Sequence, residues 1–150
     1  MSDDRVRKIA EILVNYSTKV RKGEYVKIIG DTESEPLMKE LYKLVLEKGA
    51  YPVMRISFSW ESFLYYKNAS SEQLNHFPEI VMDELKKVDC IINIAGGKNV
   101  KQLTNIDPKR MSMRQKILEP LKKESLKKRW VIFDYPGDSL AQEAEMSTEE

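Results

Sequence analysis

The chain has 150 residues, of which 41% are hydrophobic and 33% are charged, and its formal net charge is +1. This length and balance fit one compact globular domain. No segment reaches the ~20 apolar residues that span a bilayer, and the N-terminus lacks a secretory signal, so we expect a soluble cytoplasmic protein without a membrane partner. Cys90 is the single cysteine, which excludes an intrachain disulfide, and its apolar neighbours predict a core position.

Helical and strand patterns alternate along the chain. Apolar residues recur at steps of three and four from Val6 to Val20, and Tyr16 falls on this predicted buried face. Ser34 is typical of the start of a second helix, and Gly49 of its end. In chain order, the expected elements are a helix over 6–20, a strand over 24–30, a helix over 34–49, a strand over 51–58, helices over 60–68 and 70–87, a strand over 89–96, a helix over 108–128 and a strand over 129–136.

This alternation indicates the fold class. Strands joined by helical crossovers run parallel, because each crossover returns the chain to the same end of the sheet. The sequence therefore predicts a three-layer α/β domain with a mostly parallel four-stranded sheet, of the flavodoxin-like or Rossmann-like type. Pro120 lies inside the last predicted helix and lacks a backbone donor, which predicts a kink or a break there.

Two glycines follow the third predicted strand, and such a turn can bring backbone N–H groups close to a phosphate. In a nucleotide site a helix begins at once after the turn, whereas about ten residues separate Gly97 from Pro108 here. Two interpretations remain: a phosphate site, and a structural turn in which Gly96 and Gly97 supply positive φ or close packing. The distant helix start favours the structural turn, so we expect no binding of NAD, ATP or FMN.

The turn after the first predicted strand is acidic and contains Asp31, Glu33 and Glu35. Carboxylates at this position stabilise the N-terminus of the next helix through its dipole, and a metal site is the alternative interpretation. His76 is the single histidine, so neither a histidine cluster nor a zinc-type ligand spacing is present. No catalytic triad is recognisable. The residues by themselves therefore predict no catalytic and no metal-binding side chain.

The last predicted helix is strongly basic. Residues 109–129 hold nine Lys or Arg and two Glu, while residues 138–150 hold five acids and no base. Solvated helix faces, a nucleic-acid contact, and a domain or subunit contact are the three interpretations. Single-strand binders usually interleave stacking rings with their cations, and no aromatic residue precedes Trp130 in this stretch. Nucleic acid is therefore not the expected partner.

An aromatic group lies at the end of the second predicted strand and in the helix that follows it. Large rings contribute both to cores and to interfaces, so the group fits either core packing or an exposed patch that meets a partner or a domain. Its members are Phe58, Trp60, Phe63, Tyr65 and Tyr66.

Four stretches of the chain, taken together, carry a family resemblance. They are "GEYVKIIG", "EPLMKELYKLVLEKGAYPV", "VDCIINIAGGKNVKQLTNIDPKRMSMRQK" and "RWVIFDYPGDSLAQEAEMS". Over nearly its full length the chain resembles the N-terminal domain of the thermophilic metallo-aminopeptidases, of the aminopeptidase T and aminopeptidase S type (leucyl-aminopeptidase-like).

The resemblance implies a two-domain cytoplasmic enzyme, usually a homodimer, that removes N-terminal amino acids from peptide substrates. It also implies two divalent metal ions, zinc, cobalt or manganese, held by a C-terminal metal-binding domain of the same polypeptide. None of those ligands maps onto residues 1–150, so no catalytic role carries over to a residue here. The resemblance implies that this domain shapes access to the active-site cavity and supports assembly. The candidate domain or subunit contacts are Trp60, Phe63, Tyr66, Gly96, Gly97, Lys98 and Asn99.

The last residues show a helix-start pattern. Ser147 and Glu150 have the spacing of a capping box, for which an acidic solvated tail is the alternative. Together with the resemblance, this pattern predicts that the gene continues past Glu150 and that residues 1–150 alone are inactive. The competing hypothesis is a free-standing module that binds nucleic acid or a phosphorylated ligand through the basic helix over 108–129, and a stop codon after Glu150 would favour it.

Overall fold

The computed structural model describes residues 4–96 and 102–135. Within them, the strands form one four-stranded sheet in the order β2-β1-β3-β4, and each neighbouring pair runs parallel. The strands are β1 (Tyr25–Asp31), β2 (Tyr51–Ser57), β3 (Cys90–Ala95) and β4 (Arg129–Asp134). The helices are α1 (Asp4–Ile12), α2 (Glu35–Glu47), α3 (Glu61–Asn68), α4 (Ser71–Leu74), α5 (Glu79–Lys87) and α6 (Pro108–Leu126), with a π-helical turn at Leu13–Ser17 and 3-10 turns at Thr32–Ser34 and Gln102–Asn105.

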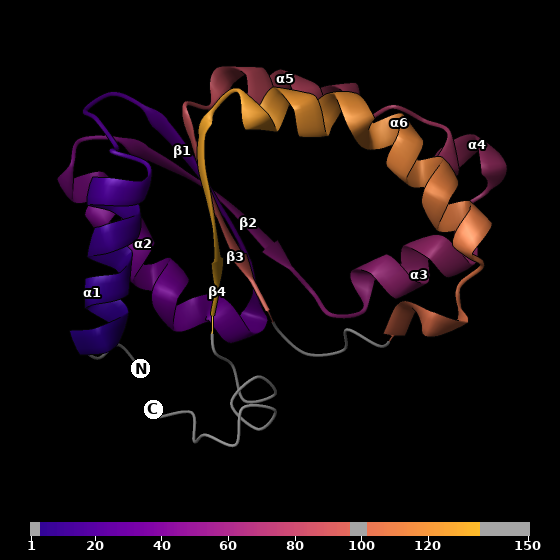
Figure 1. Cartoon of the computed structure of the whole chain (residues 1–150), viewed down its shortest axis with the longest axis horizontal. Helices are drawn as coiled ribbons and strands as arrows, with labels where there is room; N and C mark the ends of the chain where they lie inside the picture. The colour runs from indigo at the N-terminus through magenta and orange to yellow at the C-terminus, as the bar shows by residue number, and fades with distance from the viewer. Residues whose placement is uncertain (1–3, 97–101, 136–150) are drawn as a thin grey trace.

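The sheet confirms the predicted α/β class. β1 pairs with β2 from Tyr25↔Tyr51 and with β3 from Val26↔Cys90, so the first strand lies inside the sheet and later strands extend it on both sides. α1 and α2 cover one face, whereas α5 and α6 lie against the other (Figure 1). The strand order matches the start of the flavodoxin-like order, and the three layers are those that alternating helices and strands predict.

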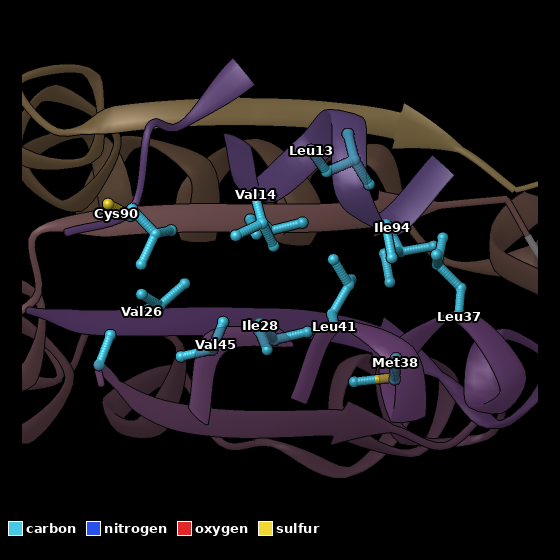
Figure 2. Packing of buried hydrophobic residues seen from close by; sticks show 14 of the residues in the cluster. Leu13, Val14, Val26, Ile28, Leu37, Met38, Leu41, Val45, Cys90 and Ile94 are labelled. Atoms are coloured by element: carbon cyan, nitrogen blue, oxygen red, sulfur yellow. The ribbon is translucent and has the colours of Figure 1, made fainter. Parts of the chain in front are cut away.

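The main core lies between α1, α2 and the sheet face formed by β1 and β3. Val26, Ile28 and Ile92 are fully buried on this face, and Leu41 and Val45 of α2 are fully buried against it. Figure 2 shows Leu41 and Val45 beside Val26 and Ile28. Burying one such aliphatic side chain stabilises a fold by about 1.5–3 kcal/mol. This face therefore supplies much of the folding free energy.

The opposite face of the sheet is covered less completely. α6, which the structure describes in full, contains no buried residue. On the edge strand β4, Trp130 stays 45% exposed and Ile132 stays 58% exposed. The small cluster on this face consists of Leu85, Val88 and Ile91, with Ile29 and Leu121 packed against them.

The first predicted helix changes its turn type along its length. α1 ends at Ile12 and continues as a π-helical turn, in which the Thr18 N–H donates to the Leu13 carbonyl at 3.1 Å. The wider turn shifts the phase of the helix, so Val14 is fully buried while Tyr16 is 74% exposed. The prediction that Tyr16 lies on the buried face is therefore wrong.

Two other helices differ from the sequence prediction at prolines. The helix expected over 70–87 is divided into α4 and α5, because Pro78 disfavours the helical conformation in the residue before it. α6 runs unbroken through Pro120, so the prediction of a break at this residue is wrong. Figure 1 shows that the helix curves along its length. Among the helices in the described part of the chain, none combines the length and the apolar character needed to cross a bilayer.

Candidate functional site

The helical arm, which we define as residues 58–78 and 102–119, contains α3, α4 and the first half of α6. It lies at the opposite end of the molecule from α1 (Figure 1). Its buried aliphatic side chains, among those described, are Leu74 and Ile106. Three of the predicted contact residues belong to it: Trp60, Phe63 and Tyr66. The arm is therefore the first place to look for a functional surface.

The aromatic group of the arm does not form a core. The rings of Phe58 and Trp60 stack with centroids 5.4 Å apart, and the two residues are 48% and 52% exposed. Tyr65 and Tyr66 meet edge to face at 5.4 Å and are half-buried, as is Phe63. Core packing is thus wrong for Phe58 and Trp60, whose stacked rings form an exposed patch just after β2. Whether Trp60, Phe63 and Tyr66 contact a domain or subunit stays a prediction.

The glycine turn lies only partly within the described residues. Gly96 has φ +104°, in the left-handed region that favours glycine, which fits the structural-turn interpretation. Gly97, Lys98 and Asn99, the other predicted contact residues of this loop, lie outside the described residues. Their role as domain or subunit contacts stays a prediction.

Basic residues of α6 and of the turn after it bind the chain's own backbone carbonyl groups. Arg110 donates from Nε to the Tyr66 carbonyl at 2.9 Å and from Nη2 to the Ala69 carbonyl at 2.5 Å. Lys128 donates to the Lys86 carbonyl at 3.1 Å. These bonds join α6 and its C-terminal turn to α3 and α5. A part of the basic run therefore has a structural role that composition alone does not reveal.

Arg114, one helical turn beyond Arg110, binds the connection between α4 and α5. Its Nη1 donates to the His76 carbonyl at 2.5 Å and to the Leu74 carbonyl at 3.3 Å. The guanidinium carbon lies 5.4 Å from the centroid of the Tyr65 ring, which is a cation–π contact. Three contacts thus fix the plane and the position of this guanidinium.

A pocket opens beside Arg114, between α3, α4 and α6. Its volume is about 480 Å³, within the ~300–1,000 Å³ of small-molecule sites. The backbone of this region is ordered by the two arginines and by a capping box in which Ser70 and Gln73 exchange hydrogen bonds. We call this cavity the arm pocket, and its lining includes Leu64, Tyr65, Ala69, Gln73, His76 and Arg114.

A second polar cluster joins the start of β4 to the loop before β1. Arg129 donates a hydrogen bond to a carboxylate oxygen of Glu24 and another, from Nε, to the Thr18 carbonyl at 2.7 Å. Glu24 also accepts from the backbone N–H of Arg21 at 2.7 Å. Burial alone would raise the pKa of Glu24, but these hydrogen bonds and the charge of Arg129 hold the pKa below its ordinary value. The cluster ties an edge strand to the main core.

Cys90 lies beside this cluster and is fully buried, which confirms its predicted core position. Arg129 donates a hydrogen bond to its Sγ at 3.1 Å. Burial raises the pKa of the Cys90 thiol to about 11, although the charge of Arg129 acts in the opposite direction. A buried thiol with a raised pKa is a poor nucleophile at neutral pH, so the geometry assigns Cys90 to packing.

The acidic turn after β1 forms a helix cap. Asp31 Oδ1 accepts from the Glu33 N–H at 3.0 Å, from the Ser34 N–H at 3.1 Å and from the Ser34 hydroxyl at 3.0 Å. Asp31 is thus the N-cap of the 3-10 turn Thr32–Ser34 that leads into α2, which fits a role at a helix start. At Gly30 a Cβ would lie 2.7 Å from Met38 Sδ, so glycine permits the close approach of α2 to the end of β1.

The carboxylates of this turn do not gather into a set of metal ligands. Within residues 4–96 and 102–135, no three His, Cys, Asp or Glu side chains gather where they could hold a metal ion. The oxygen of Asp31 nearest the turn is already occupied by three donors. The described residues therefore do not fit a metal centre, and no catalytic step is assigned to them.

Comparison with known proteins identifies the family. The sequence matches the model of the thermophilic metalloprotease family (M29) over residues 2–150. The chain belongs to this family. A search of curated proteins found no match. The family assignment therefore comes from a pattern shared along the whole chain rather than from one similar relative.

Solved structures support the fold of this member of the family. AmpT from Thermus thermophilus superposes with a TM-score of 0.70 at 18% identity, over 87% of this chain and 35% of AmpT. The chain thus spans about a third of the length of AmpT, and at this identity the likeness shows the fold alone. CurK enoyl reductase overlaps with a TM-score of 0.42 at 16% identity, over 92% of this chain and 44% of CurK, which is too loose to support an argument.

The contacts of Arg110 and Arg114 are not marked by any pattern in the sequence. Arg110 and Arg114 are four residues apart, a spacing that places two side chains on one helical face, and this was the available signal. Their partners are backbone carbonyl groups more than 35 residues away, with sequence separations from 38 to 44. No residue pattern marks a carbonyl acceptor, so the arm pocket could not be predicted.

Proposed function

We propose that residues 1–150 form the non-catalytic N-terminal domain of a longer, two-domain metal-dependent aminopeptidase. The observation that carries the proposal is the metalloprotease family match over residues 2–150. The likeness to AmpT supports it, because a single α/β unit accounts for nearly all of this chain but only 35% of AmpT. The parent enzyme would remove N-terminal amino acids from peptides.

The metal chemistry belongs, in this proposal, to a C-terminal domain of the same polypeptide. The parent would hold two divalent ions, zinc, cobalt or manganese, which supply a Lewis acid and an activated water for peptide hydrolysis. The described residues 4–96 and 102–135 bring no three metal-binding side chains together, which supports placing the ligands elsewhere. Domain 1–150 would then shape access to the cavity and support assembly.

Exposed apolar side chains support a contact role for this domain. Met54 and Ile56 of the edge strand β2 are 36% and 42% exposed, and the stacked Phe58 and Trp60 follow them along the chain. Large exposed apolar residues that cluster in this way are typical of interaction surfaces. We assign these exposed side chains, Trp60 among them, to the contact with the C-terminal domain or with the second subunit of a homodimer.

The test compares two proteins in one assay. Residues 1–150 and the longer gene product would be assayed for Leu-p-nitroanilide hydrolysis with added Co²⁺, Zn²⁺ or Mn²⁺. We expect metal-dependent turnover by the longer product and none by residues 1–150, although circular dichroism should show that the short chain is folded. Metal-dependent turnover by residues 1–150 would overturn the proposal, as would a stop codon directly after Glu150.

The basic helix α6 offers little support for binding of nucleic acid or a phosphorylated ligand. Arg110 and Arg114 are engaged with backbone carbonyl groups, which leaves fewer mobile cations on α6 to follow a phosphate backbone. The acidic turn after β1 is likewise engaged in helix capping.

A further inference from the structure

The two arm arginines use different edges of their guanidinium groups. Arg110 donates from Nε and Nη2, which form the side edge of the group, to the carbonyls of Tyr66 and Ala69. Arg114 donates from Nη1 alone. The two hydrogens of this nitrogen bind the carbonyls of Leu74 and His76. Among the described residues, none accepts a hydrogen bond from Nε or Nη2 of Arg114. This edge therefore carries two parallel N–H groups without an intramolecular partner.

Such an edge matches a carboxylate. The two N–H groups of a guanidinium side edge bind the two oxygens of a carboxylate in parallel, and these charge-assisted bonds are about twice as strong as neutral ones. The plane of the Arg114 group is held by its two carbonyl partners and by the Tyr65 ring. A ligand would therefore meet a pre-oriented fork, and little side-chain entropy would be lost on binding.

The lining of the arm pocket narrows the ligand class. Leu64, Tyr65 and Ala69 offer apolar surface beside Arg114, which is the one Lys or Arg among the described residues that line it. The single positive charge of Arg114 neutralises the charge of a monoanion. A phosphate dianion would keep one negative charge without a partner. We propose that the arm pocket binds a small carboxylate that carries an apolar group, with Arg114 as the carboxylate-binding residue. This proposal is independent of the metalloprotease assignment.

The test is a titration of the ¹⁵N-labelled 150-residue chain with N-acetyl-L-phenylalanine, followed by ¹H–¹⁵N correlation spectra. We expect saturable shifts of amides in residues 64–76 and 110–116, with a dissociation constant on the order of millimolar. N-acetyl-L-phenylalaninamide has the same shape without the charge and should bind at least ~10-fold more weakly. Absence of saturable shifts with the acid, or equal binding of the amide, would overturn the proposal.

Matched variants locate the site. Arg114→Lys keeps the charge but removes the fork, so binding should fall ~10-fold or more, whereas Lys116→Met, at an exposed position of α6 outside the pocket lining, should bind as the wild type does. If Arg114→Lys unfolds the arm, the variant Leu64→Asp tests the position of the site instead. Leu64 is 45% exposed, and a carboxylate there would compete for Arg114 and abolish binding. Unchanged binding in Leu64→Asp, or tighter binding of phenyl phosphate than of the carboxylate, would contradict the proposal.

Discussion

The main core and the helical arm are stabilised in different ways. In α2, Leu37, Leu41 and Val45 are fully buried against the sheet, whereas α3 has no buried side chain. The arm relies instead on hydrogen bonds from Arg110 and Arg114 to backbone carbonyl groups. Burial is non-directional and large in sum, while a hydrogen bond with a charged partner fixes an orientation and contributes about 1.5–3 kcal/mol.

This difference predicts two levels of stability in one chain. Segments with few buried apolar contacts open locally at a lower free energy than the core does. The arm should therefore open while the sheet stays intact, and it should return to one defined shape because its hydrogen bonds are directional. A surface of this kind can adjust to a partner without endangering the fold.

The largest effect is expected in the core. Leu41→Ala removes a fully buried side chain of α2, and the lost burial together with the cavity left behind should lower the free energy of unfolding by about 2–5 kcal/mol. Leu46 lies on the same helix but is 50% exposed, so Leu46→Ala is the matched control and should cost less than about 1 kcal/mol. Urea unfolding followed by far-UV circular dichroism measures both. Equal losses in the two variants would show that α2 is not the core helix.

The next effect concerns the ion pair that ties β4 to the core. Glu24→Gln should lower the free energy of unfolding by about 1–2 kcal/mol at pH 7, a value reduced because Arg129 is about a third exposed. The pKa of Glu24 is lowered in the fold, so its contribution is present above the ordinary value near 4.5 and is lost as the pH falls through the folded pKa. The difference between wild type and variant should therefore shrink on acidification.

Glu61 provides the control for this prediction. A hydrogen bond from Arg55 lowers the pKa of Glu61 in the same direction, but the Arg55 side chain is 52% exposed. Glu61→Gln should therefore cost less than Glu24→Gln, and its pH dependence should be weaker. Chemical unfolding at several values between pH 3 and pH 7 compares the two. A Glu24→Gln variant with unchanged stability at every pH would contradict the structural role of the pair.

A smaller and local effect is expected in the arm. Arg110→Lys replaces two donors with one flexible ammonium group, so the arm should open more easily by about 1 kcal/mol while global stability changes little. Hydrogen exchange should then quicken about fivefold for amides in residues 61–74 and not for those of β1. Lys116→Met, at an exposed position on the same helix, is the control. Uniform quickening across the sheet would mean that arm and core unfold as one unit.

The smallest effect is expected at the stacked aromatic pair. Trp60→Ala removes a ring that is already half exposed, so the free energy of unfolding should change by less than about 1 kcal/mol. Thermal unfolding measures it, with Phe58→Ala as the companion variant. A decrease in the free energy of unfolding of about 3 kcal/mol or more would show that Trp60 packs as a core residue. The arm would then be stabilised by burial, as the main core is.

The core was predictable because its signals are local and periodic. The four strands lie within a residue or two of their predicted ranges, since apolar β-branched runs bounded by glycine or charge leave few alternatives. Leu41 and Val45 are buried because the period of the helix places them on one face. Tyr16 was misplaced because a single wide turn changes that period, and no residue type marks a π-helical turn.

The candidate site was less predictable because its contacts are distant in sequence. The aromatic residues and the basic helix were recognised, but composition could not show that Arg114 faces the His76 carbonyl or that Glu24 faces Arg129. Both pairs depend on how the chain crosses over, which is a property of the topology. The family resemblance supplied a function that the residues alone did not indicate, and the family match over residues 2–150 supports it.

The buried cysteine can be used to measure opening of the core by thiol labelling. Cys90 is the single cysteine of the sequence, lies on the central strand β3 and keeps its proton at neutral pH because burial raises the pKa of the thiol. A thiol reagent can reach it only when the packing around Sγ opens, and this packing includes Thr18 and Arg129. The labelling rate of Cys90 therefore measures how often the core around this residue opens. It should not change when only the arm opens. Without any engineered probe, one chemical reaction can distinguish the two motions.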